Sequence, residues 1–240
     1  MSEWAPKRFW KTADTVEVPG GYGVVLDSRP VRTPAKAVLH VPSAALAQEI
    51  AAEFDAQEDR IDPRTMPFTR MANAAVDKVS IQRSEVADML AEYGDSDLLC
   101  YRADAPDELV ARQNQQWDPL LDWAAQALNA RLVPRVGVIH EPQDPAALSE
   151  LRTRVHKMSA FELAAFHDLV SISGSLVIGF AAKERAVPAT ELWAVSRVDE
   201  AWQEEQWGRD DEAHEMAELK KAAFLHADRF MRLIDRQSAS

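Results

Sequence analysis

One change in the spacing of apolar residues divides this chain, and it constrains the fold more than any other feature of the sequence. Before Pro42, short apolar runs are separated by turns that contain proline and glycine. Such runs, bounded by such turns, are typical of β-strands. The strands expected from them cover residues 16–18, 22–26, 31–34 and 38–41.

After Pro42 the apolar residues follow helical spacing. Ser43 is a good helix N-cap, and Leu46, Ile50 and Phe54 follow it at intervals of four. From Phe68 onward nearly every segment has this spacing. The helices expected there cover residues 68–80, 83–93, 106–116, 118–130, 145–157, 159–172, 174–184, 189–207 and 210–233, with one short strand at 136–139.

The sequence therefore predicts an α+β protein with a small β-rich N-terminal domain followed by a larger all-helical domain. The composition shifts near residue 80, so we expect residues 1–80 to form the β-rich domain, with one packed helix, and residues 81–240 to form the helical domain. A chain of 240 residues is long enough for each domain to bury a hydrophobic core.

The net negative charge of the chain limits the classes of molecule that it can bind. The chain has 39 acidic and 27 basic residues, a net charge of −12, so phosphate backbones and anionic lipids repel it. We therefore expect no nucleic-acid partner and no membrane insertion, and we expect a protein partner instead. The single cysteine, Cys100, fits a reducing compartment, and residues 1–8 resemble no secretion or transit signal, so we expect a cytoplasmic protein.

Signatures of catalysis are few. Glycines 20, 21 and 23 lie in a predicted hairpin rather than before a helix, so they do not form a phosphate-binding loop. Asp211 and His214 have the spacing of metal ligands on one helix face, and Glu215 follows them, which leaves a metal-dependent hydrolase as an alternative. The default interpretation of these three residues is a solvated acidic face. We expect no enzyme activity, no catalytic residue, no bound metal and no cofactor.

The segment at residues 191–215 (ELWAVSRVDEAWQEEQWGRDDEAHE) combines tryptophans with acids. On a single helix, residues spaced by seven such as Trp193, Glu200 and Trp207 share a face. Tryptophans are frequent hot spots of protein interfaces, although they also fill cores, and that alternative stays open here. The predicted partner-binding residues are Trp193, Arg197, Asp199, Glu200, Gln203, Glu204 and Trp207.

Five motifs occur in a fixed order along the chain. They are residues 26–34 (LDSRPVRTP), 66–73 (MPFTRMAN), 97–102 (DLLCYR), 116–120 (QWDPL) and a block of Glu200, Trp202, Gln203, Trp207, Gly208, Ala213 and His214. Together, over residues 8–230, they resemble the family of assembly chaperones for the alpha subunit of the F-type ATP synthase catalytic head. Two positions depart from the family pattern, since Ser28 stands where glycine is usual and Glu215 where aspartate is usual.

The resemblance implies a function without chemistry. It implies a chaperone that binds the alpha subunit, prevents its aggregation and promotes assembly of the alpha/beta ring. The resemblance also singles out an acid near residue 200 for function, and both Glu200 and its neighbour Asp199 are candidates. It also implies a bacterial, cytoplasmic relative of proteins that act in the mitochondrial matrix of eukaryotes. We expect a monomer, and an acidic adaptor for another oligomeric ATPase is the remaining alternative.

Overall fold

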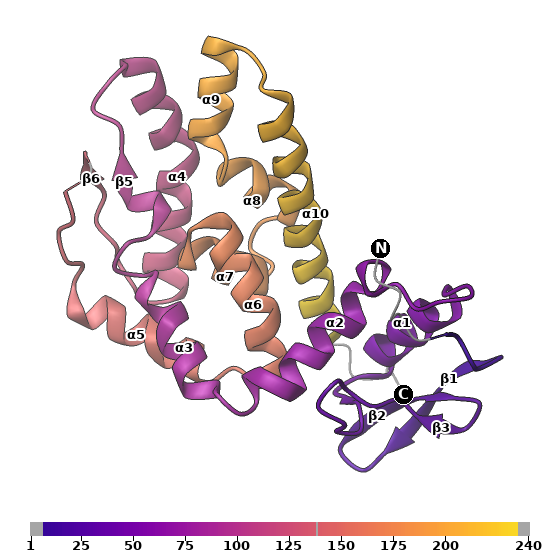
Figure 1. Ribbon diagram of the computed structural model, residues 1–240. Coiled ribbons are helices and arrows are strands. Elements are labelled where there is room, and N and C mark those ends of the chain that lie inside the picture. Colours follow the sequence, from indigo (N-terminus) through magenta and orange to yellow (C-terminus); the bar gives the residue numbers. More distant parts are fainter. Residues whose placement is uncertain (1–6, 138, 235–240) are drawn as a thin grey trace. The chain divides into compact units, whose positions relative to one another are not determined.

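The computed structural model describes residues 7–137 and 139–234 and confirms the α+β class (Figure 1). Contacts within the chain define two compact units. One comprises Met1–Arg83, Ser159–Ala165 and Arg229–Ser240, and the other comprises Ser84–Met158 and Phe166–Asp228. The division of the chain into domains at residue 80 stays a prediction.

An antiparallel sheet begins the first unit. Its strands are β1 (Ala13–Val18), β2 (Gly21–Leu26), β3 (Arg29–Pro30) and β4 (His40–Val41). Strand β2 pairs with the other three, and the β1–β2 hairpin closes with Val18 opposite Gly21. Gly21 is needed there because a Cβ atom would overlap the carbonyl oxygen of Val41. The expected strand at 31–34 is not formed, and Arg32 makes only an isolated bridge to Val38.

Helix α1 (Ala44–Asp55) packs on this sheet through the residues predicted from its spacing. Leu46 and Ile50 are fully buried. Ser43 is the N-cap, as predicted, and its hydroxyl accepts a hydrogen bond of 3.1 Å from the amide of Leu46.

A buried carboxylate sets the start of the next helix, α2 (Pro67–Ala74). Glu53 accepts hydrogen bonds from the amides of Phe68 (2.6 Å) and Thr69 (2.7 Å) and from the Thr69 hydroxyl (2.6 Å). These amides belong to the first turn of α2 and have no partner within the helix. Burial raises the pKa of the Glu53 carboxyl despite these hydrogen bonds. Helix α2 then continues into a π-helical turn, Ala75–Val79.

We expect Glu53→Gln to lower the free energy of unfolding by about 2 kcal/mol, because an amide side chain cannot accept hydrogen bonds at both of its ends. Urea denaturation followed by circular dichroism measures the change. Glu49→Gln is the matched control, since Glu49 lies one turn earlier on α1 and pairs at the surface with Arg229. Its expected cost is below about 1 kcal/mol. Equal costs for the two variants would contradict the assigned role of Glu53.

The second unit is helical. Its elements are α3 (Arg83–Glu92), β5 (Tyr101–Arg102), α4 (Asp107–Ala127), β6 (Arg135–Val136), α5 (Pro145–His156), α6 (Ala160–Ser173), α7 (Leu176–Lys183), α8 (Ala189–Val195), α9 (Val198–Trp207) and α10 (Asp211–Ile234). Helices α6 and α10 contribute residues to both units. Helix α7 packs against α4 and α8, and seven of its eight residues are buried (Figure 1).

Two expectations for this unit are corrected. The helices expected at 106–116 and 118–130 are one helix, α4, with Pro119 inside it. Packing overrides the lost backbone hydrogen bond, because Trp117, Leu120 and Leu121 beside this proline are all buried. The strand expected at 136–139 is shorter, since β6 ends at Val136 and residue 138 lies outside the described residues. Its parallel partner β5 was not predicted.

Asp97 joins two helical segments of this unit. Its side chain is fully buried and caps the short 3₁₀ helix Leu98–Cys100, where it accepts from the Leu99 amide at 3.0 Å. Its other oxygen accepts at 3.0 Å from the amide of Val177, in the first turn of α7. Burial raises the pKa of Asp97 to about 6, against the opposing effect of these hydrogen bonds. One carboxylate therefore serves two helix starts that are far apart in sequence.

No helix within the described residues has both the length and the apolar character needed to cross a bilayer.

Candidate partner-binding site

The segment expected to form one helix over 189–207 forms two, so this prediction was wrong. Helix α8 ends at Val195 and α9 begins at Val198. The indole nitrogen of Trp117 donates to the Val195 carbonyl at 2.9 Å, and the Ser196 hydroxyl donates to the Trp193 carbonyl at 2.7 Å. These side chains take the place of helical partners, so the chain turns here. The single face predicted for Trp193, Glu200 and Trp207 does not form.

Trp193 lies in the core of the helical unit. Its side chain is 7% exposed, and its ring lies 6.0 Å from that of Phe224 on α10. The guanidinium of Arg197, which follows α8, lies 5.7 Å from the same ring. Trp193 and Arg197 therefore form the base of the corner from which α9 starts.

Helix α9 presents most of its surface to solvent. Only Val198 is buried among its ten residues, and Trp207 at its end is 79% exposed. Gly208 ends the helix, as predicted, with a φ of +90° that disfavours residues with a Cβ atom. The α9 surface consists of the predicted residues that are exposed on this helix, Glu200, Gln203, Glu204 and Trp207.

Two neighbouring residues of α4 hold α9 in place. Arg112 makes two hydrogen bonds of 2.8 Å to the carboxylate of Glu205, and its guanidinium lies 4.9 Å from the ring of Trp202. The paired guanidinium lowers the pKa of the Glu205 carboxyl. The next residue, Gln113, donates to Asp199 at 2.7 Å. Paired geometry of this kind restricts the orientation of α9 as well as stabilising it.

The two candidate acids, Asp199 and Glu200, have different surroundings. Asp199 is half-buried and bonded to Gln113, whose amide oxygen accepts in turn from the Ala103 amide at 2.9 Å. Glu200 is exposed and pairs with Arg197 at 2.6 Å. Asp199 thus contributes to the attachment of α9, whereas Glu200 lies at the surface in an ion pair with Arg197.

The central motif at 97–102 has a structural part in the fold. Arg102 is buried, and its guanidinium donates to the Leu99 carbonyl (2.9 Å), Asn114 (2.8 Å) and Asp118 (2.8 Å). It also lies 5.2 Å from the Trp117 ring. Cys100 is buried, as predicted, and burial raises the pKa of its thiol to about 12.

The residues proposed as metal ligands are not assembled into a site. The Nδ1 atom of His214 lies 4.0 Å from a carboxylate oxygen of Glu204 on α9, and Asp211 pairs with Arg209. Over residues 7–137 and 139–234, no group of three or more histidine, cysteine, aspartate or glutamate side chains is arranged to hold a metal ion.

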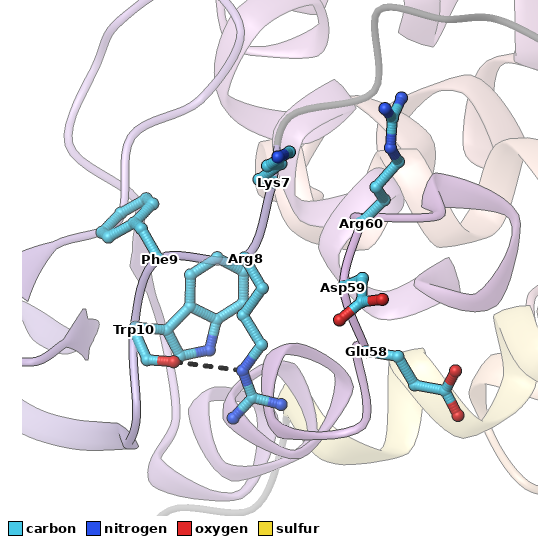
Figure 2. A pocket seen from close by; sticks show the side chains of 7 residues that line it. All are labelled: Lys7, Arg8, Phe9, Trp10, Glu58, Asp59 and Arg60. Atoms are coloured by element: carbon cyan, nitrogen blue, oxygen red, sulfur yellow. Dashed lines mark hydrogen bonds between the residues drawn. The ribbon is translucent and has the colours of Figure 1, made fainter.

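A cavity of about 650 Å³ lies in the first unit and was not predicted (Figure 2). Lys7, Arg8, Phe9, Trp10, Glu58, Asp59 and Arg60 line it. The Arg8 guanidinium is already used within the chain, since it donates to the carbonyls of Trp10 (3.1 Å) and Asp55 (2.9 Å). These contacts fasten the N-terminal segment to the end of α1 rather than preparing a charged group for a ligand.

Sequence reasoning missed the residues of α4 that support α9. Arg112 and Gln113 lie 93 and 86 positions from their partners Glu205 and Asp199, and nothing in one sequence pairs them. It also missed two exposed apolar residues of α10, Met216 and Leu219. Their helical spacing equals that of core residues, so periodicity alone cannot show that they face solvent.

Known proteins share both the sequence pattern and the fold. The family model described as ATP12 chaperone protein matches residues 7–125. The crystal structure of Atp12 from Paracoccus denitrificans is 48% identical, with a TM-score of 0.94 over 97% of this chain and 100% of that one. A mutant of the same Paracoccus protein is 47% identical, with the same TM-score and coverage. The mitochondrial protein atp12 of Schizosaccharomyces pombe is 25% identical over 222 residues, which are 88% of this chain and 76% of that protein.

Proposed function

Because this chain belongs to the Atp12 chaperone family, we propose that it binds the alpha subunit of the F-type ATP synthase catalytic head and catalyses no reaction. In this role it prevents aggregation of the free alpha subunit and promotes assembly of the alpha/beta ring. We propose that it acts in the bacterial cytoplasm and that its oligomeric state is a monomer.

The observation that carries this proposal is the α9 surface. It places a tryptophan that is 79% exposed beside acidic side chains, on a helix that α4 holds in one orientation. Exposed tryptophans are frequent anchors of protein interfaces, and carboxylates attract arginine and lysine on a partner. A rigid helix also loses little conformational entropy when it binds.

A chaperone that covers the alpha subunit in this way has a clear physical effect. A subunit that alternates with another in a ring exposes, before assembly, the apolar surface of its future interface. Such a surface aggregates unless another protein covers it. Binding of the chaperone stabilises the soluble subunit by mass action, and the beta subunit displaces the chaperone when it binds the same surface more tightly.

Co-expression with an isolated ATP synthase alpha subunit tests the proposal. We expect more soluble alpha subunit, co-elution of the two proteins on size exclusion, and release of the chaperone when beta subunit is added. Aggregated alpha subunit, with this chain eluting alone, would contradict the proposal. Retrieval of a different oligomeric ATPase in a pull-down would favour the adaptor alternative, and a stoichiometric metal in elemental analysis would favour the hydrolase alternative.

We expect Glu200→Lys to raise the Kd for the alpha subunit by about tenfold, because it reverses a charge on the α9 surface and places a cation beside Arg197. Titration of labelled alpha subunit gives the Kd, and circular dichroism checks the fold. Glu150→Lys on α5 is the control, since Glu150 is also exposed and the change in net charge is the same. An unchanged Kd for Glu200→Lys, or an equal rise for the control, would argue against a specific role of Glu200.

A further inference from the structure

The first half of α10 turns an apolar stripe toward solvent. Its half-buried residues His214, Ala217 and Lys221 follow helical spacing and face the helical unit. On the opposite side, Met216 is 52% exposed and Leu219 is 65% exposed. Residues spaced by three on a helix are neighbours on its surface, so Met216 and Leu219 lie side by side. The α10 stripe is defined as Met216, Leu219, Ala222 and the half-buried Ala223, and it runs about 10 Å along the helix.

Acidic residues lead into this stripe from α9, and two lysines, Lys220 and Lys221, lie within its length. Residues 199–218 hold nine acids and only one arginine, Arg209. The acids are Asp199, Glu200, Glu204, Glu205, Asp210, Asp211, Glu212, Glu215 and Glu218. Glu205 is occupied by Arg112, whereas Glu212 and Glu215 are exposed on the same helix as the stripe. The N-terminal half of the stripe thus has an acidic border, whereas in its C-terminal half Lys221 pairs with Glu218 at 3.5 Å.

The charge of the whole chain decides what can cover such a strip. A second copy of this chain carries the same net charge of −12 and the same acidic border, so like charges oppose a symmetric dimer there. An anionic membrane is opposed for the same reason. A segment with apolar side chains on one face and arginine or lysine beside them satisfies both the apolar stripe and its border.

We propose that the α10 stripe is a second contact surface of this chaperone, and that it binds a basic amphipathic segment of the partner protein. The inference rests on the proposed function, because the partner is the same alpha subunit, and it adds where and through which chemistry the contact is made. The α9 surface then supplies an aromatic anchor and charge, and the α10 stripe supplies an apolar contact two turns long.

The full chain carrying both Met216→Ser and Leu219→Ser tests the apolar part, with isolated alpha subunit as the probe. We expect the Kd to rise at least about tenfold, because two exposed apolar contacts are lost and no core residue changes. Thermal unfolding should be unchanged. The control carries Ile81→Ser and Met89→Ser, which remove two exposed apolar residues elsewhere and should leave the Kd unchanged.

Replacing Glu212 and Glu215, the two exposed acids of the border, together by glutamine tests the charged part. We expect weaker binding and a smaller increase of Kd with added salt, since fewer charge pairs remain to be screened.

The outcomes separate this inference from the proposed function. Binding of the unaltered chain together with a Kd within about twofold for the double serine variant would overturn the α10 stripe and leave the proposed function standing. An unchanged salt dependence in the glutamine variant would overturn the basic character assigned to the partner segment. Failure of the unaltered chain to bind alpha subunit would overturn the proposed function and this inference with it.

Discussion

Trp117→Ala should lower the free energy of unfolding by about 4 kcal/mol, the largest effect that we expect from one substitution. The Trp117 side chain is fully buried, its indole nitrogen bonds the last carbonyl of α8, and Arg102 lies over its ring. Alanine would leave a cavity, an unpaired Val195 carbonyl and a buried guanidinium without its aromatic neighbour. Urea denaturation followed by circular dichroism measures the loss.

Two further variants show which part of the Trp117 side chain matters. Trp207→Ala removes the same side chain from an exposed position and should change the free energy of unfolding by less than about 0.5 kcal/mol. Trp117→Phe keeps an aromatic ring but removes the donor to Val195, so it should cost about 1 kcal/mol or somewhat more. It should also weaken alpha-subunit binding, because this hydrogen bond helps to form the corner from which α9 starts. Equal stability losses for Trp117→Ala and Trp207→Ala would contradict the assignment of Trp117 to the core.

The second large effect is expected at Asp97. Asp97→Asn keeps the shape of the side chain but leaves one of the amides of Leu99 and Val177 facing an NH₂ group. We expect a loss of about 2 to 3 kcal/mol at neutral pH, since an unpaired buried polar group costs about this much. Asp144→Asn is the matched control, because Asp144 caps α5 from an exposed position and asparagine caps helices equally well there.

We expect the difference in stability between the parent protein and the Asp97→Asn variant to depend on pH. The pKa of Asp97 is about 6 in the folded chain, above its ordinary value of 3.8, so the folded state binds this proton more tightly than the unfolded state does. As pH falls through about 6 toward about 4, the parent protein therefore gains stability from this group, and the asparagine variant gains none. The difference in unfolding free energy between the two should grow by about 2 kcal/mol from about pH 7 to about pH 4.5.

Denaturation of both proteins at each pH gives that difference directly, and other titrating groups cancel because both proteins contain them. A difference that shrinks as the pH falls would mean that the hydrogen bonds of Asp97 outweigh its burial.

Local sequence was sufficient for the parts of the fold that depend on neighbouring residues. The change of hydrophobic spacing after Pro42 identified the order of strands and helices, and Ser43 and Gly208 marked helix ends. The physical reason is that strand alternation, helical spacing, N-caps and left-handed glycines act within about one turn of the chain. The same information placed the acidic and aromatic residues of the α9 surface in one segment, because they are close in sequence.

Tertiary contacts decided the parts of the fold that local sequence could not. The sequence by itself predicted one helix through 189–207, whereas α8 ends at Val195, where the Trp117 indole from α4 and the Ser196 hydroxyl take backbone carbonyls. Spacing could not separate Trp193 in the core from Trp207 at the surface, nor identify Met216 and Leu219 as exposed, because an apolar period is the same on either side of a helix. Arg112, Gln113 and Asp97 take partners about eighty or more residues away. Such pairings exist only once packing brings distant segments together, so the sequence determined which residues are available, and the tertiary structure decided which of them hold α9 and which face solvent.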